Sequence, residues 1–124
     1  MIRRRQSIRR TYEAAFRRID GLRFLGSSDG YVDDDNCWLS CIVLDPHYFR
    51  VGPPEVIRSL ENMGIEARHL WKPMHLQPVF SQNRVFDTGV GARMFDNGLA
   101  LPSGSGLNDE EVAHVIAPVR TLLT

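Results

Sequence analysis

Lysine is almost absent from this chain of 124 residues. Lys72 is the single lysine, so arginine supplies nearly all of the 15 cationic side chains, which balance 15 aspartates and glutamates. The formal net charge is +0, which leaves no overall field to attract nucleic acid or an anionic membrane. A partner must therefore be recognised by a local group of side chains, and Lys72 is a candidate member of such a group.

Cysteine is scarce too, and long hydrophobic runs are missing. Cys37 and Cys41 would lie about 13 Å apart in an extended segment, too far for a disulfide, so we expect two buried thiols. No apolar run approaches the roughly twenty residues that cross a bilayer. The opening Met-Ile-Arg-Arg-Arg lacks the apolar stretch of a signal peptide. Together these absences predict a soluble, cytoplasmic protein with reduced thiols.

A hydrophobic content of 43% is ordinary, and the length suits one domain with a modest core. Residues 2–19 carry apolar side chains at three- and four-residue spacing, which predicts an amphipathic helix closed by Gly21. The arginines of this segment suggest a nucleic-acid patch, but they lack the interleaved aromatic residues of a base-stacking surface. We therefore expect a solvated helix face formed by Arg3, Arg4, Arg5, Arg9 and Arg10.

Short apolar runs predict strands further along the chain. The run at 38–44 has apolar residues on both faces, which is typical of a strand covered on both sides, and we assign Trp38 to the core. Pro53 has the position of a helix start. Gly64 has the position of a residue that ends a helix in the left-handed backbone conformation. The other predicted elements are strands at 22–25, 65–70 and 99–101 and a helical turn at 92–95.

The last helix has clear signals at its start. Asn108 and Glu111 have the spacing of a capping box. Pro118 should kink the helix or end it early, because proline donates no hydrogen bond and its ring clashes with a preceding carbonyl. The turn at residues 103–106 lacks the spacing of a phosphate-binding loop, so we expect it to be the entry to this helix.

The acidic stretch at residues 27–36 suggests a calcium loop. Three adjacent aspartates do not provide the alternating oxygen ligands, the central glycine and the late glutamate that such a loop needs. We therefore predict a solvated turn.

Residues 64–80 combine cations, aromatic rings and two prolines without regular periodicity. Arg68 offers a charged fork, Lys72 a point charge and His75 a titratable donor, which suits an anionic ligand such as the diphosphate of a nucleotide sugar. Trp71 adds a flat wall on which a sugar or base can stack. Each residue alone has an ordinary structural explanation, but their clustering after a strand favours a substrate-binding role.

The runs Gly-Ile-Glu-Ala-Arg and Trp-Lys-Pro-Met-His-Leu-Gln-Pro, followed by Leu-Pro-Ser-Gly-Ser at 101–105, resemble one known family. They are similar to the C-terminal small domain of the DegT/DnrJ/EryC1/StrS sugar aminotransferases, which use pyridoxal phosphate (PLP). The resemblance spans nearly the whole chain. It implies an α+β fold, the two-layer small domain of a fold-type I PLP-dependent transferase, with helices packed on a small, mostly antiparallel sheet. It also implies an interdomain-type helix at 1–20 and a small C-terminal domain at 21–124.

In that family the segment lines the active-site mouth, so the resemblance implies that Arg68, Trp71, Lys72 and His75 contact the substrate. The implied reaction of a full-length enzyme transfers an amino group from an amino acid such as glutamate to a keto-sugar nucleotide in polysaccharide or glycan biosynthesis. PLP is the implied cofactor, but the family's cofactor lysine would lie before residue 1. Lys72 has no acid or phosphate-binding donors near it in sequence. We therefore expect no bound cofactor, no metal and no catalytic residue in this chain, and inactivity on its own.

The resemblance also implies partners. Surface that meets a large domain in the family would be exposed here, and we expect Ile2, Ile8, Tyr12 and Phe16 to contribute to it. Such a surface favours a homo-oligomer or association with a PLP-binding large domain, and an isolated domain should bind a nucleotide sugar weakly. Two alternatives remain: a free-standing ligand-binding or interaction module derived from such an enzyme, and an arginine-rich nucleic-acid binder. On the main reading, neither nucleic acid nor a membrane is a partner.

Overall fold

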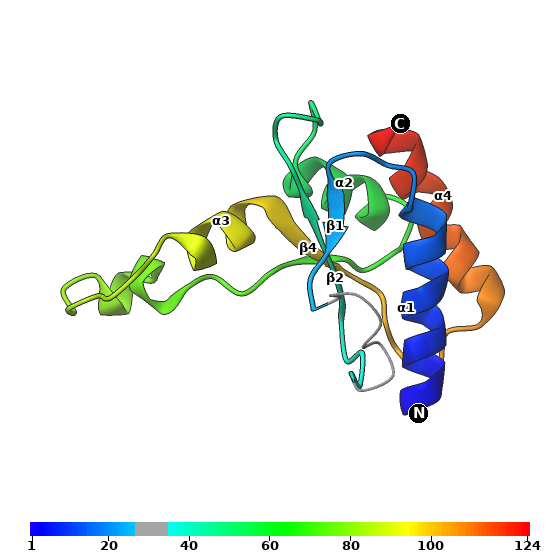
Figure 1. Ribbon diagram of the computed structural model, residues 1–124, viewed down its shortest axis with the longest axis horizontal. Helices are drawn as coiled ribbons and strands as arrows, with labels where there is room; N and C mark the ends of the chain where they lie inside the picture. The colour runs from blue at the N-terminus through cyan, green and yellow to red at the C-terminus, as the bar shows by residue number, and fades with distance from the viewer. Residues whose placement is uncertain (27–34) are drawn as a thin grey trace.

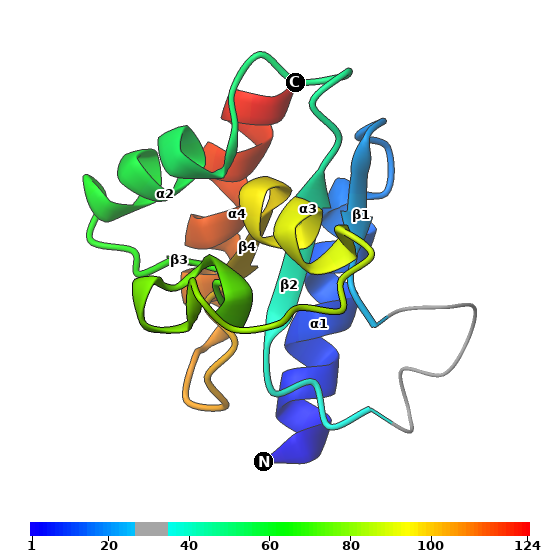
Figure 2. The ribbon, with the colours of Figure 1, turned by 90° about the vertical axis from the view of Figure 1, so that its left-hand side faces the viewer.

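The computed structural model describes residues 1–26 and 35–124. Helices lie on both faces of a small sheet, and one arm of the chain extends away from this body (Figures 1 and 2). The described elements are α1 (Ile2–Phe16), β1 (Leu22–Phe24), β2 (Ser40–Leu44), α2 (Pro53–Glu61), β3 (Arg68–His69), the 3-10 turns η2 (Met74–Leu76) and η3 (Pro78–Phe80), α3 (Val90–Asn97), β4 (Gly98–Leu101) and α4 (Asp109–Leu123).

The strands form one sheet in the order β1-β2-β4-β3, and each neighbouring pair is antiparallel. Ser40 pairs with Leu101 in the centre, and Arg68 pairs with Ala100 at the β3 edge. The buried side chains of α1, α2 and α4 share one core on one face, whereas α3 lies on the opposite face (Figures 1 and 2). The expected α+β fold with a small antiparallel sheet is therefore confirmed.

Helix α1 is part of this core. The predicted apolar stripe is correct, because Ile8, Tyr12, Phe16 and Ile19 are all buried. The Tyr12 hydroxyl donates a hydrogen bond to the carbonyl of Pro102 at 2.9 Å, and burial raises the pKa of this phenol. The expectation that Ile8, Tyr12 and Phe16 form an exposed association surface is therefore wrong: helix α4 and the sheet cover them.

The arginines of α1 do not all form a solvated face, so that expectation is wrong for Arg9. Arg9 is only 4% exposed. Its guanidinium donates to Glu13 at 2.7 Å and to the carbonyl of Leu25 at 2.8 Å, and it lies 4.3 Å from the centre of the Phe24 ring. Arg4 also has a structural role, since it donates to the carbonyl of Leu107 and pairs with Asp109 at 2.7 Å. Arg9 and Arg4 thus connect α1 to the β1 end and to the start of α4.

Helix α2 begins and ends where the sequence predicts. Pro53 is its first residue, and Gly64 has a positive φ of 73° beyond its end. The amide of Ile65 donates to the carbonyl of Leu60 at 2.9 Å, and both side chains are buried. This is the hydrogen bond and the hydrophobic contact of a left-handed helix cap.

Gly64→Ala is expected to lower the free energy of unfolding by about 1 kcal/mol, because a Cβ disfavours the left-handed conformation. Urea denaturation measures this change. Gly104→Ala is the matched control, because Gly104 has no positive φ and a Cβ there would meet no atom within 4 Å. Equal stability of the two variants would contradict the cap.

Strand β2 begins later than predicted. The alternation in 38–44 predicts a strand from Trp38, but β2 starts at Ser40 and Trp38 is 59% exposed. The assignment of Trp38 to the core is therefore wrong. Cys37 has a positive φ of 47°, so the chain turns immediately before Trp38 and the strand alternation cannot be extended back to it. The expected burial of the strand on both faces holds for residues 40–44, of which only Cys41 is partly exposed.

Helix α4 has the predicted start but a different end. The Asn108 side chain accepts a hydrogen bond from the Glu111 amide, and the Glu111 side chain accepts one from the Asn108 amide, each at 2.8 Å. The helix continues through Pro118 to Leu123, so it does not end early. Val119 and Leu123 are buried on the same side as the preceding stripe, and this packing holds the last turns in place.

The predictions for the cysteines hold in part. Cys37 and Cys41 are free thiols, Cys37 is buried and Cys41 is half-buried. Burial raises the pKa of both thiols, which keeps them protonated and weakly reactive.

Most of the predicted acidic turn lies outside the described residues. Among the described residues, none of the helices has both the length and the apolar content to cross a membrane.

Candidate functional site

Residues 71–80 of the segment that the sequence singles out form the first half of the arm, which we define as residues 71–89 between β3 and α3. Figure 1 shows the arm, in green to yellow, extending away from the body. Two 3-10 turns follow one another in it, and Pro73 and Pro78 each precede or begin one of them. The Gln77 side chain donates to the carbonyl of Lys72 at 3.2 Å. The strand expected at 65–70 is thus only Arg68–His69, and residues 71–80 belong to the irregular but hydrogen-bonded arm.

Trp71 and Lys72 lie at the base of the arm, and both are exposed. Trp71 is 67% exposed and contacts the ring of Trp38, with 5.8 Å between ring centres and 37° between ring planes. Trp38 comes from the chain just before β2, so Trp71 contacts a residue that the sequence analysis placed in the core. Asp35 and Asn36 are a local signal that the strand has not yet begun, because their side chains accept hydrogen bonds from the amides of Cys37 and Trp38.

Arg68 and His75 each have an acidic partner. Arg68 is exposed on the edge strand, and its Nε donates to Glu66 at 2.7 Å. His75 Nε2 lies 3.4 Å from a carboxylate oxygen of Asp87, which connects the outgoing and returning halves of the arm. The predicted set is therefore split: Trp71 and Lys72 are adjacent at the base, Arg68 is on the sheet edge, and His75 is farther along the arm.

The guanidinium of Arg68 can exchange its carboxylate partner for another anion. The Arg68 and Glu66 side chains are 78% and 71% exposed, and an exposed ion pair of this kind contributes at most about 1 kcal/mol. A phosphate that offers two oxygens to the guanidinium can replace the carboxylate. Glu66 would thus compete with an anionic ligand at this edge.

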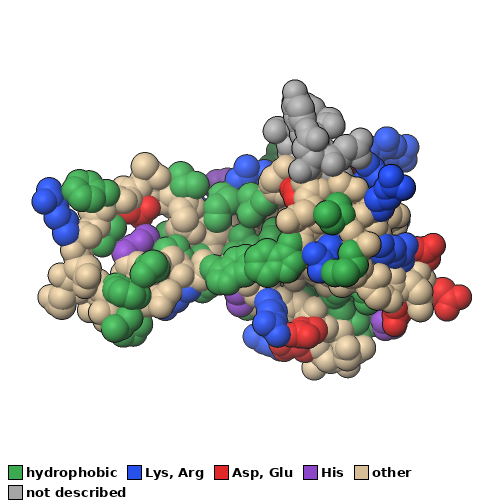
Figure 3. Space-filling model, turned by 90° about the horizontal axis from the view of Figure 1, so that it is seen from below, with side chains coloured by type: hydrophobic (Ala, Val, Ile, Leu, Met, Phe, Trp, Pro, Cys, Tyr) green, Lys and Arg blue, Asp and Glu red, His purple; other side chains and the backbone are tan. Residues whose placement is uncertain are grey.

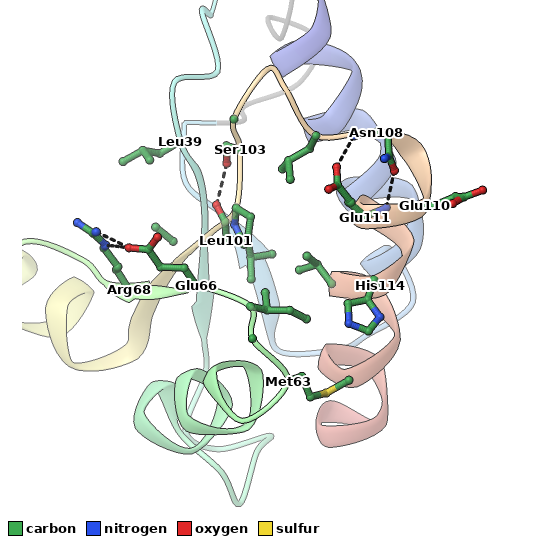
Figure 4. A pocket seen from close by; sticks show the side chains of 17 residues that line it. Leu39, Met63, Glu66, Arg68, Leu101, Ser103, Asn108, Glu110, Glu111 and His114 are labelled. Atoms are coloured by element: carbon green, nitrogen blue, oxygen red, sulfur yellow. Dashed lines mark hydrogen bonds and ion pairs between the residues drawn. The ribbon is translucent and has the colours of Figure 1, made fainter.

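Sequence reasoning missed a cavity of about 890 Å³ beside the site. Residues 63–66 and the end of β4 line it, and Figure 4 shows α4 forming the other wall. Ser103 at its edge is part of the scaffold, since its hydroxyl donates to the carbonyl of Leu101 and accepts from the amide of Ser40. The predicted entry turn to the last helix is correct. Side chains that line the cavity include Met63, Glu66, Arg68, Leu101, Glu111 and His114.

The described residues do not fit covalently bound PLP. A lysine that binds this cofactor needs a desolvated pocket, an acid opposite the pyridine nitrogen and donors around the phosphate. Lys72 is exposed on the arm. Within the described part of the chain, no group of three or more His, Cys, Asp or Glu side chains is placed to hold a metal ion.

Comparisons with known proteins match nearly the whole chain. The model of the DegT/DnrJ/EryC1/StrS aminotransferase family matches residues 1–120. The chain is 35% identical over 119 residues to EpsN of Bacillus subtilis, named as a pyridoxal phosphate-dependent aminotransferase, and the match covers 93% of this chain and 29% of that protein. It is 32% identical over 69 residues to GDP-perosamine synthase of Caulobacter vibrioides, which covers 56% of this chain and 19% of that protein.

Solved structures show the same fold. The aminotransferase TlmJ from Streptoalloteichus hindustanus superimposes with a TM-score of 0.82 at 23% identity, covering 98% of this chain and 31% of that one. Helicobacter pylori PseC, an aminotransferase of pseudoaminic acid biosynthesis, also gives 0.82, at 19% identity over 98% of this chain and 32% of that one. The chain thus spans less than a third of the length of these relatives. On the match over residues 1–120, this chain belongs to the DegT/DnrJ/EryC1/StrS aminotransferase family.

Proposed function

We propose that this chain is the substrate-gripping C-terminal domain of a PLP-dependent nucleotide-sugar aminotransferase. The reaction of the whole enzyme moves an amino group from an amino acid to a keto-sugar nucleotide, for use in polysaccharide or glycan biosynthesis. The observation that carries the proposal is the exposure of Trp71 and Lys72 side by side at the base of the arm, in a member of this family. Two relatives support the substrate class by their names: one makes GDP-perosamine, and DesI was solved with a TDP-sugar product.

The side chains suit the parts of a nucleotide sugar. Lys72 is a mobile point charge for the diphosphate, and Arg68 can bind two phosphate oxygens at once after leaving Glu66. Trp71 presents an apolar face, and Pro73 and Pro78 limit the freedom that the arm would lose on binding. His75 adds a hydrogen-bond donor, and a positive charge when it is protonated. The proposed substrate contacts are Arg68, Trp71, Lys72 and His75.

This role separates substrate binding from cofactor chemistry. PLP supplies the means of moving the amino group, and it would be held by a large domain of the enzyme. The residues of this chain bind and orient the sugar nucleotide and cover it from bulk water. A free-standing ligand-binding module would use the same contacts without the large domain.

Uridine diphosphate (UDP) is expected to bind the chain weakly, with a dissociation constant in the millimolar range, about 4 kcal/mol of binding free energy. Amide shifts in NMR should be largest between Arg68 and His75. Lys72→Ala and Arg68→Ala should each weaken binding severalfold, and added salt should do the same because the contacts are exposed charges. Glu66→Gln should strengthen binding, since it frees Arg68 from its carboxylate partner.

Arg3→Ala is the matched control, because Arg3 is an exposed arginine on α1 far along the chain from the arm. It should leave UDP binding unchanged. Shifts confined to residues 3–18, or a loss of binding in Arg3→Ala alone, would contradict the proposal and favour an arginine-rich nucleic-acid surface.

A further inference from the structure

The chain has two tryptophans, and they contact each other at the surface. Trp38 is 59% exposed and Trp71 is 67% exposed. Hydrophobic side chains cover the face where the arm joins the body (Figure 3). Large aromatic side chains are normally buried, so an exposed pair of this kind indicates a ligand or a partner.

Trp38 is held in this exposed position by its own chain. The Asn36 side chain accepts from the Trp38 amide at 2.9 Å, and the Asp35 side chain accepts from the Cys37 amide at 2.7 Å. Between them, Cys37 has a φ of 47°, a conformation that non-glycine residues seldom adopt. Gln6 on α1 also donates to the carbonyl of Asp35 at 2.9 Å. These hydrogen bonds tie the chain before β2 to α1 and to itself, so Trp38 is presented outward from a hydrogen-bonded support.

Trp71 is supported from the other side of the contact. Leu70, just before it, is buried, and Leu70 occupies the space that a side chain at Gly98 would need. Pro73, two residues later, fixes the direction of the arm, and it packs near Gly91 at the start of α3. The pair therefore joins two parts of the domain, the chain before β2 and the arm base, in one aromatic surface.

We infer that Trp38 and Trp71 together form a platform on which the base of the nucleotide sugar stacks. This inference rests on the proposed function and adds Trp38 as a binding residue. A nucleobase presents a π-face to the indole rings, and stacking of this kind tolerates any base. Lys72 follows Trp71 directly, so a base on the platform leaves the diphosphate within reach of the lysine charge. A sugar ring has no such π-face, and we assign it no place on the platform.

Tryptophan fluorescence tests the platform directly, because the only tryptophans are the two in the pair. Three probes separate the parts of the ligand: UDP has a base and a diphosphate, pyrophosphate has only the phosphates, and glucose has neither. UDP should quench the fluorescence after correction for its absorbance. Pyrophosphate should shift the Lys72 amide in NMR without quenching, and glucose should do neither.

Trp38→Leu should weaken UDP binding on the order of tenfold and leave pyrophosphate binding unchanged. Trp38→Phe should keep part of the UDP affinity that Trp38→Leu loses. Tyr48→Leu is the matched control, because Tyr48 is a 63% exposed aromatic residue beside Gly21 and should not affect UDP. Urea unfolding of each variant checks that the exposed substitutions leave the fold intact.

The outcomes of these experiments distinguish a base platform at Trp38 and Trp71 from the proposed function as a substrate-binding domain. If UDP shifts the amides of Arg68 to His75 but neither quenches fluorescence nor loses affinity in Trp38→Leu, the platform is wrong and the proposed function stands. If neither UDP nor pyrophosphate perturbs those amides, both fail. If Trp38→Leu changes only the mass of the protein in solution, the pair is a contact between protein surfaces and not a base platform.

Discussion

Phe16→Ala is expected to lower the free energy of unfolding by about 3–5 kcal/mol. Phe16 is 1% exposed, and its ring lies 6.1 Å from that of Tyr12 and 6.3 Å from that of Phe24. It thus links α1 to β1 across the core. Alanine would remove the ring and leave a cavity that the sheet and α4 cannot close, because both are held by other contacts.

Urea denaturation at constant pH measures this loss, and Ile2→Ala is its control. Ile2 is on the same helix but 54% exposed, so its removal should change stability by about 0.5 kcal/mol or less. Similar losses in both variants would show that α1 is not a core element. A small domain has little stability to spare, so Phe16→Ala should also shift the unfolding midpoint strongly.

This expectation reverses the one drawn from the sequence, and the reason is physical. Three- and four-residue spacing of Ile8, Tyr12 and Phe16 shows that α1 has an apolar stripe, but it does not show which surface covers the stripe. The local signals were more reliable. The left-handed Gly64 and the Asn108 cap act within four residues of themselves, so the sequence alone determines them.

Long-range contacts explain most of the remaining errors. Arg9 is buried because Glu13, Leu25 and Phe24 meet around it, and only Glu13 stands at a spacing that the sequence makes visible. Trp38 was misplaced because one residue with a positive φ, Cys37, breaks the alternation that defines a strand face. A two-residue period carries no warning of such a break.

The sequence proposes residues for the candidate site but gives no indication of the side chains that they contact. The unusual composition of 64–80 and its resemblance to the family led to Arg68, Trp71, Lys72 and His75 as the proposed substrate contacts. Their contacts with Glu66, Trp38 and Asp87 depend on how the arm leaves the sheet. The contact between Trp38 and Trp71 and the ion pair between Arg68 and Glu66 therefore became visible only with the fold.

Glutamate-dependent amino transfer is expected to be undetectable with this chain alone. Lys72 is the only lysine, and it is exposed on the arm and not enclosed with an acid and phosphate donors. Exposed amines react with PLP without selectivity. Borohydride reduction followed by mass spectrometry should thus find only adducts that increase steadily with PLP concentration and never saturate.

The control for this assay is Lys72→Arg, which keeps the positive charge and removes the amine. With PLP, glutamate and a keto-sugar nucleotide present, the original chain and Lys72→Arg should both release no more oxoglutarate than a blank without protein. A saturable adduct at Lys72, together with turnover that disappears in Lys72→Arg, would contradict the proposal that this chain binds substrate and a large domain holds PLP. It would mean that the arm closes into a desolvated pocket when ligands bind. Because UDP binding and amino transfer are measured separately, such a result would revise the role of Lys72 without removing the nucleotide site.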